Sequence, residues 1–113
     1  MLLILGEHDK GRGIPFHPST VSGRRLRKML EDLNLNARLE NIYSIDGNGN
    51  CTLNSLPEMR GSDTVVALGK IVADLCRRQG IEAIYLPHPA ARQQKQLEKL
   101  RAGLAAIKQK ECL

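Results

Sequence analysis

Short apolar runs that alternate with helical patterns constrain the fold of this chain more than any other feature. Runs rich in Leu, Ile and Val are predicted as strands, and the amphipathic stretches between or after them as helices. The predicted strands are residues 2–5, 39–45, 63–69 and 81–86, and the predicted helices are about 22–33, 70–79 and 91–110. Because strands alternating with helices form mainly parallel sheets covered on both faces, we expect an α/β protein. Its architecture is predicted as a three-layer α/β/α sandwich with a four-stranded, mainly parallel sheet.

Local signals set the expected ends of these elements. Ser22 is predicted as the N-cap of the first helix, and Gly80 as the residue that closes the second. Residues 46–62 are mostly polar, so a turn followed by an irregular loop is expected there. The length of 113 residues predicts a single domain over residues 1–113. The second helix is expected to bury Ile71, Val72, Leu75 and Cys76.

Two polar loops follow predicted strands, and open α/β sheets bind ligands where their strands end. The first loop carries Glu7 and Phe16, and the second carries His88. A carboxylate at a strand end can orient water or stabilise a developing cation, and an imidazole can donate a hydrogen bond to an oxygen that gains negative charge. An aromatic ring between two prolines can stack on a base. The structural alternatives are a solvated loop for Glu7, a turn residue for His88 and a core residue for Phe16.

The basic side chains indicate a polyanionic partner. The formal net charge is +5, which suits nucleic acid. Several cations cluster in the first turns of the first predicted helix, where they oppose the helix macrodipole. These are Arg24, Arg25, Arg27 and Lys28. A phosphate partner would account for that placement, and a solvated basic face is the alternative. A second basic run, which includes Arg92, is expected to solvate an exposed helix face.

The cysteines and histidines argue against several other classes of site. Three widely spaced cysteines without a C-x-x-C pair favour neither a disulfide framework nor structural zinc. The spacing of His8, His17 and His88 does not predict a metal site. The apolar run at the N-terminus is too short for a signal peptide or a membrane span. We therefore expect a cytoplasmic protein without a cofactor or a membrane partner. The oligomeric state stays open, with a monomer favoured.

Five segments occur in an order that resembles the uracil-DNA glycosylase superfamily, over nearly the whole chain. They are residues 3–9 (LILGEHD), 13–18 (GIPFHP), 41–46 (NIYSID), 65–70 (VVALGK) and 86–92 (LPHPAAR). The family opens with an apolar strand and a Gly-Glu-x-Pro-Gly loop, followed by Gly-x-Pro-Phe. A Val-Tyr-Ile-Thr-Asn strand, a Val-x-Leu-Gly-Arg/Lys turn and a His-Pro-Ser loop come later. The segment at 16–18 also resembles the Pro-Phe-x-His-Pro stretch of the mismatch-specific branch.

The resemblance implies a monofunctional DNA repair enzyme that flips a base out of DNA and hydrolyses its N-glycosidic bond, because a stacked base hides its reacting atoms. Glu7 would position or activate water, and His88 would stabilise the departing base anion. His8, Phe16 and Asp46 would bind the base. The phosphates of the DNA would meet Ser22, Arg24, Arg25 and Arg92. No metal or cofactor is implied, since three cysteines cannot supply the four ligands of the family's iron–sulfur branch.

Some positions depart from the family pattern. Asp46 replaces an Asn, and an ionised carboxylate only accepts hydrogen bonds; the base is then not uracil, or Asn48 or Asn50 serves instead. Ala90 replaces the Ser that contacts phosphate, and residues 8–9 lack the family's Pro. These departures leave two alternatives. The chain is a catalytically inactive relative that binds DNA or a nucleotide, or a nucleotide-processing α/β protein that prefers free nucleotides.

Overall fold

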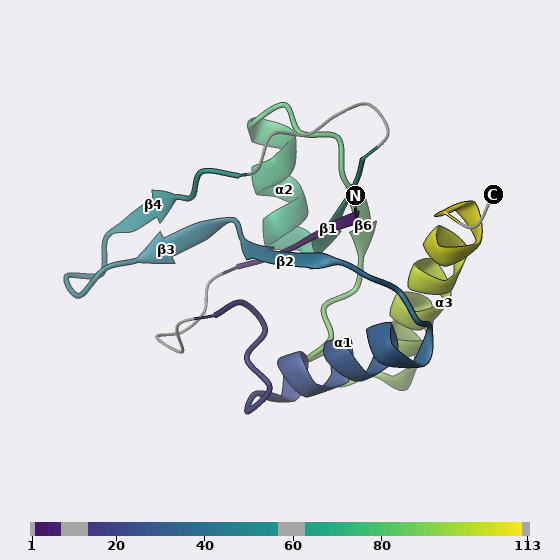
Figure 1. Cartoon of the computed structure of the whole chain (residues 1–113). Coiled ribbons are helices and arrows are strands. Elements are labelled where there is room, and N and C mark those ends of the chain that lie inside the picture. Colours follow the sequence, from purple (N-terminus) through teal and green to yellow (C-terminus); the bar gives the residue numbers. More distant parts are fainter. Residues whose placement is uncertain (1, 8–13, 57–62, 112–113) are drawn as a thin grey trace.

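Four parallel strands form the centre of the fold, which we describe from a computed structural model for residues 2–7, 14–56 and 63–111. The sheet order is β2-β1-β5-β6, as expected of a parallel α/β sheet. Its strands are β1 (Leu2–Gly6), β2 (Arg38–Asn41), β5 (Thr64–Leu68) and β6 (Ile84–Leu86). The helices are α1 (Val21–Asp32), α2 (Lys70–Arg78) and α3 (Gln94–Glu111). The chain thus has the predicted α/β character, and Figure 1 shows the elements in sequence colours.

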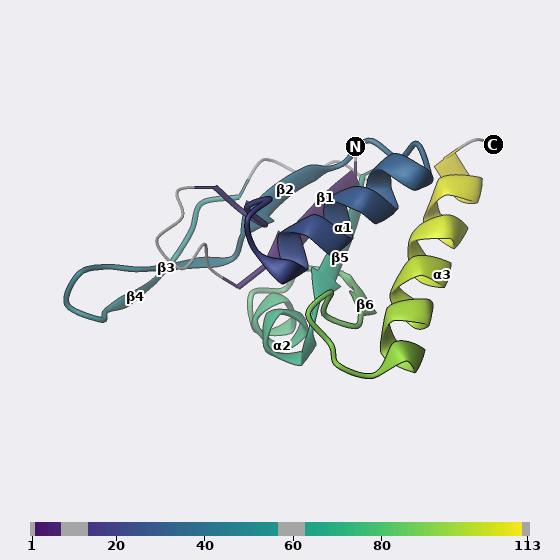
Figure 2. The same ribbon diagram turned by 90° about the horizontal axis from the view of Figure 1, so that it is seen from below.

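Helices cover both faces of this sheet. Figure 2 shows α1 and α3 on one face and α2 on the other. The continuous apolar run of β1 follows from this arrangement, because successive side chains point to opposite faces. Leu2 and Ile4 pack with α1 and α3, whereas Leu3 and Leu5 pack with α2. The predicted burial of this strand on both faces is confirmed, since all its residues are buried.

Helix α1 begins slightly earlier than predicted, at Val21. Its N-cap is Thr20, whose hydroxyl accepts a hydrogen bond from the Gly23 amide at 3.0 Å. The same hydroxyl donates to the His17 carbonyl at 2.7 Å. The prediction of Ser22 as N-cap was therefore wrong. Both residues carry a suitable hydroxyl, and the contact of Thr20 with the preceding loop decides between them.

Helix α2 is bounded by two glycines with left-handed backbones. Gly69 precedes the helix with φ 92°, and Gly80 follows it with φ 73°, as predicted for a closing glycine. The expected apolar face is only partly buried, because Ile71 is 57% exposed. Val72 and Cys76 carry the packing against the sheet. Ile71 lies instead in the first turn of the helix.

The predicted strand at 39–45 was wrong as a single element. It divides at Ile42, which is 2% exposed and donates its amide to the Gly6 carbonyl at 2.9 Å. Beyond it, β3 (Tyr43–Ile45) pairs antiparallel with β4 (Cys51–Leu53), which was predicted as irregular loop. The hairpin projects from the body of the molecule (Figure 1). Its turn lies at the predicted residues 46–50, where Asp46 and Asn50 pair through their backbones.

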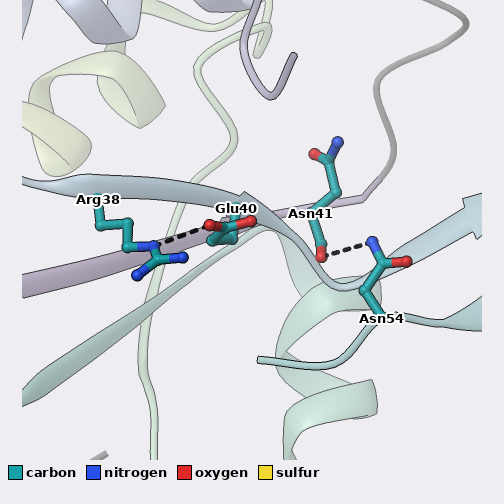
Figure 3. Close-up of polar contacts among 4 residues, drawn as sticks. All are labelled: Arg38, Glu40, Asn41 and Asn54. Carbon is teal, nitrogen blue, oxygen red and sulfur yellow. Dashed lines mark hydrogen bonds and ion pairs between the residues drawn. The ribbon is translucent and has the colours of Figure 1, made fainter. Parts of the chain in front are cut away.

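The base of this hairpin is tied to the end of β2. Asn54 donates its side-chain amide to the Asn41 carbonyl at 2.9 Å, as Figure 3 shows. Its backbone amide donates to the Ile42 carbonyl at 3.0 Å. On β2 itself, Arg38 and Glu40 form an ion pair of 2.9 Å along the outer edge of the sheet. Such charges discourage another strand from pairing with this edge.

Candidate functional site

A pocket of about 460 Å³ lies at the carboxyl ends of β1, β5 and β6. Glu7 contributes from the end of β1, residues 69–71 from the turn between β5 and α2, and Tyr85, Pro87 and His88 from β6 and the loop after it. The chain leaves β1 towards β2 on one side and leaves β5 towards β6 on the other. The pocket therefore adjoins the point where the strand order reverses, which is where open α/β sheets bind ligands.

Glu7 and His88 both line this pocket. The two residues are 81 positions apart in the sequence, and the parallel sheet brings the ends of their strands to one edge. The ends of the first and last predicted strands were expected to bring Glu7, Phe16 and His88 around one cavity; Glu7 and His88 line it, and Phe16 does not.

Tyr43 holds the Glu7 carboxylate. Its hydroxyl donates a hydrogen bond to Glu7 Oε2 at 3.2 Å, and its backbone amide donates to the Glu7 carbonyl at 3.2 Å. Burial raises the pKa of Tyr43, and the negative charge of Glu7 and this hydrogen bond raise it further. The phenol therefore remains a protonated donor at neutral pH. The sequence pattern does not indicate this role, because Tyr43 fits a strand and lies 36 residues from Glu7 in the chain.

His88 is oriented by its own loop. Its Nδ1 accepts the backbone amide of Ala90 at 3.0 Å, so the proton of the neutral imidazole lies on Nε2. Pro87 and Pro89 on either side are buried, which fixes the backbone around the ring. Gly69 packs beside it: a Cβ at that position would lie 3.7 Å from Cβ and Cδ2 of His88.

The β5–α2 turn adds a positive edge to the pocket. Gly69 has no side chain to cap the helix, and the first turn of α2 contains no acidic residue. The first amides of a helix carry a partial positive charge, and the side chain of Lys70 also lines the pocket. Neither Gly69 nor Lys70 was among the predicted site residues. The rule that ligands bind at strand ends, applied to the run that ends in Gly69, would have found them.

Two arginines of α1 hold the loops that follow β1 and β6. Arg25 donates from Nη1 to the carbonyls of Pro89 at 3.1 Å and Ala91 at 3.2 Å. Arg27 donates to the carbonyls of Phe16 at 2.7 Å and Pro15 at 3.0 Å. Arg25, predicted to meet DNA phosphate, thus has backbone partners within the protein. Clustering of cations on α1 is partly explained by this loop binding, which sequence spacing could not reveal.

Phe16 lies in the core. The side chain is 9% exposed and belongs to the cluster under α1 and α3. Its ring covers Gly6 so closely that a Cβ there would lie 2.5 Å from Phe16 Cζ. The backbone of Phe16 has φ 50°. Phe16 does not line the pocket that Glu7 and His88 share. Its position is that of a core residue, which was the structural alternative to a ring that stacks on a base.

Asp46 also lies away from that pocket. It is exposed in the turn of the β3–β4 hairpin, and its Oδ1 accepts the backbone amides of Asn48 at 2.8 Å and Asn50 at 2.9 Å. These backbone hydrogen bonds, that of Asn50 foremost, lower the pKa of the Asp46 carboxyl. The carboxylate therefore stabilises the turn. Asn48 and Asn50, the alternative base-reading residues, belong to the same turn.

The remaining predicted residues are scattered. Ser22 lies in the first turn of α1 with its hydroxyl 3.5 Å from that of Thr20. Arg24 and Arg92 are exposed, which leaves them accessible to a phosphate. His8 lies outside the described residues. Within the described part of the chain, no group of three His, Cys, Asp or Glu side chains could hold a metal ion, and no helix is long and apolar enough to cross a bilayer.

Comparisons with known proteins identify no relative of this chain. No family model, no curated protein and no solved structure matches the chain. The function must therefore be argued from the pocket itself.

Proposed function

We propose that this protein is a DNA glycosylase-like hydrolase with a fold related to that of uracil-DNA glycosylases. It would cleave the N-glycosidic bond of a flipped, modified or mispaired base. The observation that carries the proposal is that Glu7 and His88 line one pocket at the carboxyl ends of β1 and β6. A carboxylate and an imidazole at one cavity can serve the two halves of glycosidic cleavage, the sugar and the leaving base.

In this mechanism the bond between the sugar C1′ and the base nitrogen breaks, and its electron pair leaves with the base. His88 donates a hydrogen bond from Nε2–H to the base oxygen that gains negative charge. The amino end of α2 and Lys70 favour the same anion. Glu7 stabilises the oxocarbenium-like sugar and accepts a proton from the water that attacks C1′. That proton passes to the base, so the products are the neutral base and an abasic sugar.

Tyr43 supports this role of Glu7. Its hydroxyl donates a hydrogen bond to one carboxylate oxygen, Oε2, which restricts the orientation of the carboxylate. A fixed dipole or charge stabilises a transition state without reorganising during the reaction. Tyr43 acts in this scheme as a positioning residue, because it touches Glu7 rather than the substrate.

The test is base release from oligonucleotides that carry uracil, hypoxanthine, xanthine or modified cytosines, scored as abasic sites. Glu7→Gln and His88→Ala should each lower release of the accepted base by about 10²–10⁴-fold, with circular dichroism unchanged. Glu31→Gln is the matched control, because Glu31 is exposed on α1. Full activity of both site variants on that base would refute the assignment.

A catalytically inactive relative that binds DNA or a nucleotide is the second candidate. The burial of Phe16 and the place of Asp46 in a hairpin turn favour it, because both residues were expected to bind the base. Such a protein would bind DNA with salt-dependent affinity and form no abasic site from any duplex of the panel.

Competition by mononucleotides would reveal the third possibility, a nucleotide-processing α/β protein. A cytoplasmic monomer remains our expectation in each case.

A further inference from the structure

The aromatic side chains of this chain have three different environments. The protein has one Phe, two Tyr and no Trp. Phe16 is 9% exposed in the core cluster, and Tyr43 is half-buried with its hydroxyl on Glu7. Tyr85 is 46% exposed and lines the same pocket as Glu7 and His88. Of the three rings, Tyr85 alone is both exposed and part of this pocket.

The register of the sheet explains the position of Tyr85. It pairs with Ala67 on β5, and Ala67 packs on the α2 face. Its neighbour Leu86 packs in the opposite cluster, under α1 and α3. Because side chains alternate along a strand, Tyr85 stands on the α2 face while Ile84 stands on the other. Tyr85 thereby flanks the first turn of α2, and Lys70 of that turn lines the same pocket.

We propose that Tyr85 is the stacking platform for the base in this pocket. The inference rests on the proposed function, and it replaces Phe16 with Tyr85 as the ring that binds the base. A purine or pyrimidine ring stacked on the exposed phenol would present its edge to the other pocket residues, Glu7 and His88 among them. Stacking between a base and an aromatic side chain tolerates different bases, because every base has a π-face.

The burial of Phe16 argues for this exchange of roles. For Phe16 to stack on a base, its ring would have to leave Gly6 and the core cluster it belongs to. Tyr85 requires no such rearrangement, since nearly half of its surface is already exposed. Its phenol also combines an apolar face with a polar tip, which suits a ring at the boundary of a wet pocket.

The experiment compares two end-labelled DNA duplexes by fluorescence anisotropy. One carries 2-aminopurine opposite an abasic-site analogue, so that the base is unpaired; the other carries the analogue on both strands. The wild-type protein should bind the first duplex about 10- to 100-fold more tightly, the range expected of one stacked base. Tyr85→Ala should abolish this preference, and Tyr85→Phe should retain it. Ile84→Ala, on the same strand but the opposite face, is the control and should retain it.

The outcomes separate the inference from the proposed function. The stacking role is overturned if Tyr85→Ala keeps the preference for the base-containing duplex. It is also overturned if the wild type shows no such preference. Base release by Tyr85→Ala with an unchanged KM overturns it too, and leaves the hydrolase intact. A preference that depends on Tyr85 without any abasic product supports the stacking role while the hydrolase proposal fails.

Discussion

The pocket and the β3–β4 hairpin carry residues that the sequence placed in one site, yet they are built in different ways. The loops around the pocket are held by contacts between distant parts of the chain. Arg25 reaches Pro89, and the Gly69 amide donates to the Leu86 carbonyl at 2.9 Å. At the tip of the hairpin, Asp46 bonds residues two and four positions away. The sheet brings Glu7 and His88 to one pocket, whereas Asp46 stays in the hairpin turn that it stabilises. Contacts between distant parts of the chain therefore distinguish the candidate site from the hairpin turn.

The largest effect should come from the core residue that packs against the end of β1, next to Glu7. Phe16→Ala should lower the free energy of unfolding by about 3–5 kcal/mol, the usual cost of removing a buried aromatic ring. The ring covers Gly6, directly before Glu7. Urea denaturation measures the change, and Phe16→Leu should cost less because it leaves a smaller cavity. A loss below about 1 kcal/mol for Phe16→Ala would show that the ring is not part of the core.

The two glycines that bound α2 give a sharper comparison. Gly69→Ala and Gly80→Ala should each cost about 1–2 kcal/mol, because both positions have a left-handed backbone. Only Gly69 lies beside His88; a Cβ at Gly80 would meet no atom within 4 Å. Gly69→Ala should therefore also reduce base release, and Gly80→Ala should not. Equal activity of the two variants would mean that the β5–α2 turn does not position His88.

A smaller effect is expected at the Tyr43 hydroxyl. Tyr43→Phe removes one hydrogen bond and should lower the free energy of unfolding by about 0.5–1 kcal/mol at pH 7. The folded protein holds the pKa of Tyr43 above its ordinary value of 10.0. The wild type should therefore lose stability as the pH rises through the folded pKa, because the unfolded chain ionises first. Denaturation curves between neutral and alkaline pH should show the gap between the two proteins narrowing. A constant gap would contradict the contact with Glu7.

The smallest effect should come from the hairpin. Asp46→Ala removes the acceptor for the amides of Asn48 and Asn50, which loosens a turn that is already exposed. Base release should stay within about twofold of the wild type, since surface changes away from packed features usually have little effect. Loss of activity in this variant, with the melting temperature unchanged, would show that the hairpin tip is part of the site. The contrast between the pocket and the hairpin would then not hold.

The fold was predictable where the pattern is long and repeated. The apolar run at β1, the alternation of strands with helices and the glycine after α2 follow from hydrophobic periodicity and backbone chemistry. The meeting of Glu7 and His88 at one edge followed from the same rules. Finer features depend on tertiary contacts: Thr20 rather than Ser22 caps α1, and the chain turns at Ile42 without a Gly or Pro to mark it.

The candidate site was predictable only in part, for the same reason. Asp46 fits a family motif, but its turn chemistry is satisfied locally and takes it into the hairpin. Phe16 lies between prolines as a stacking ring would, but the absence of a side chain at Gly6 lets the ring settle on β1. The use of Arg25 as a loop clamp requires a contact across 64 residues, which spacing along the chain does not encode.

The two arginine clamps of α1 have a consequence for engineering. Arg25 and Arg27 lie two residues apart on one helix, yet one donates to the segment after His88 and the other to the segment around Phe16. A shift of that helix would displace both segments together. A loop transplanted from another protein would therefore need backbone carbonyls placed to accept hydrogen bonds from Arg25 or Arg27. Replacing one loop could shift helix α1 and thereby disturb the other loop.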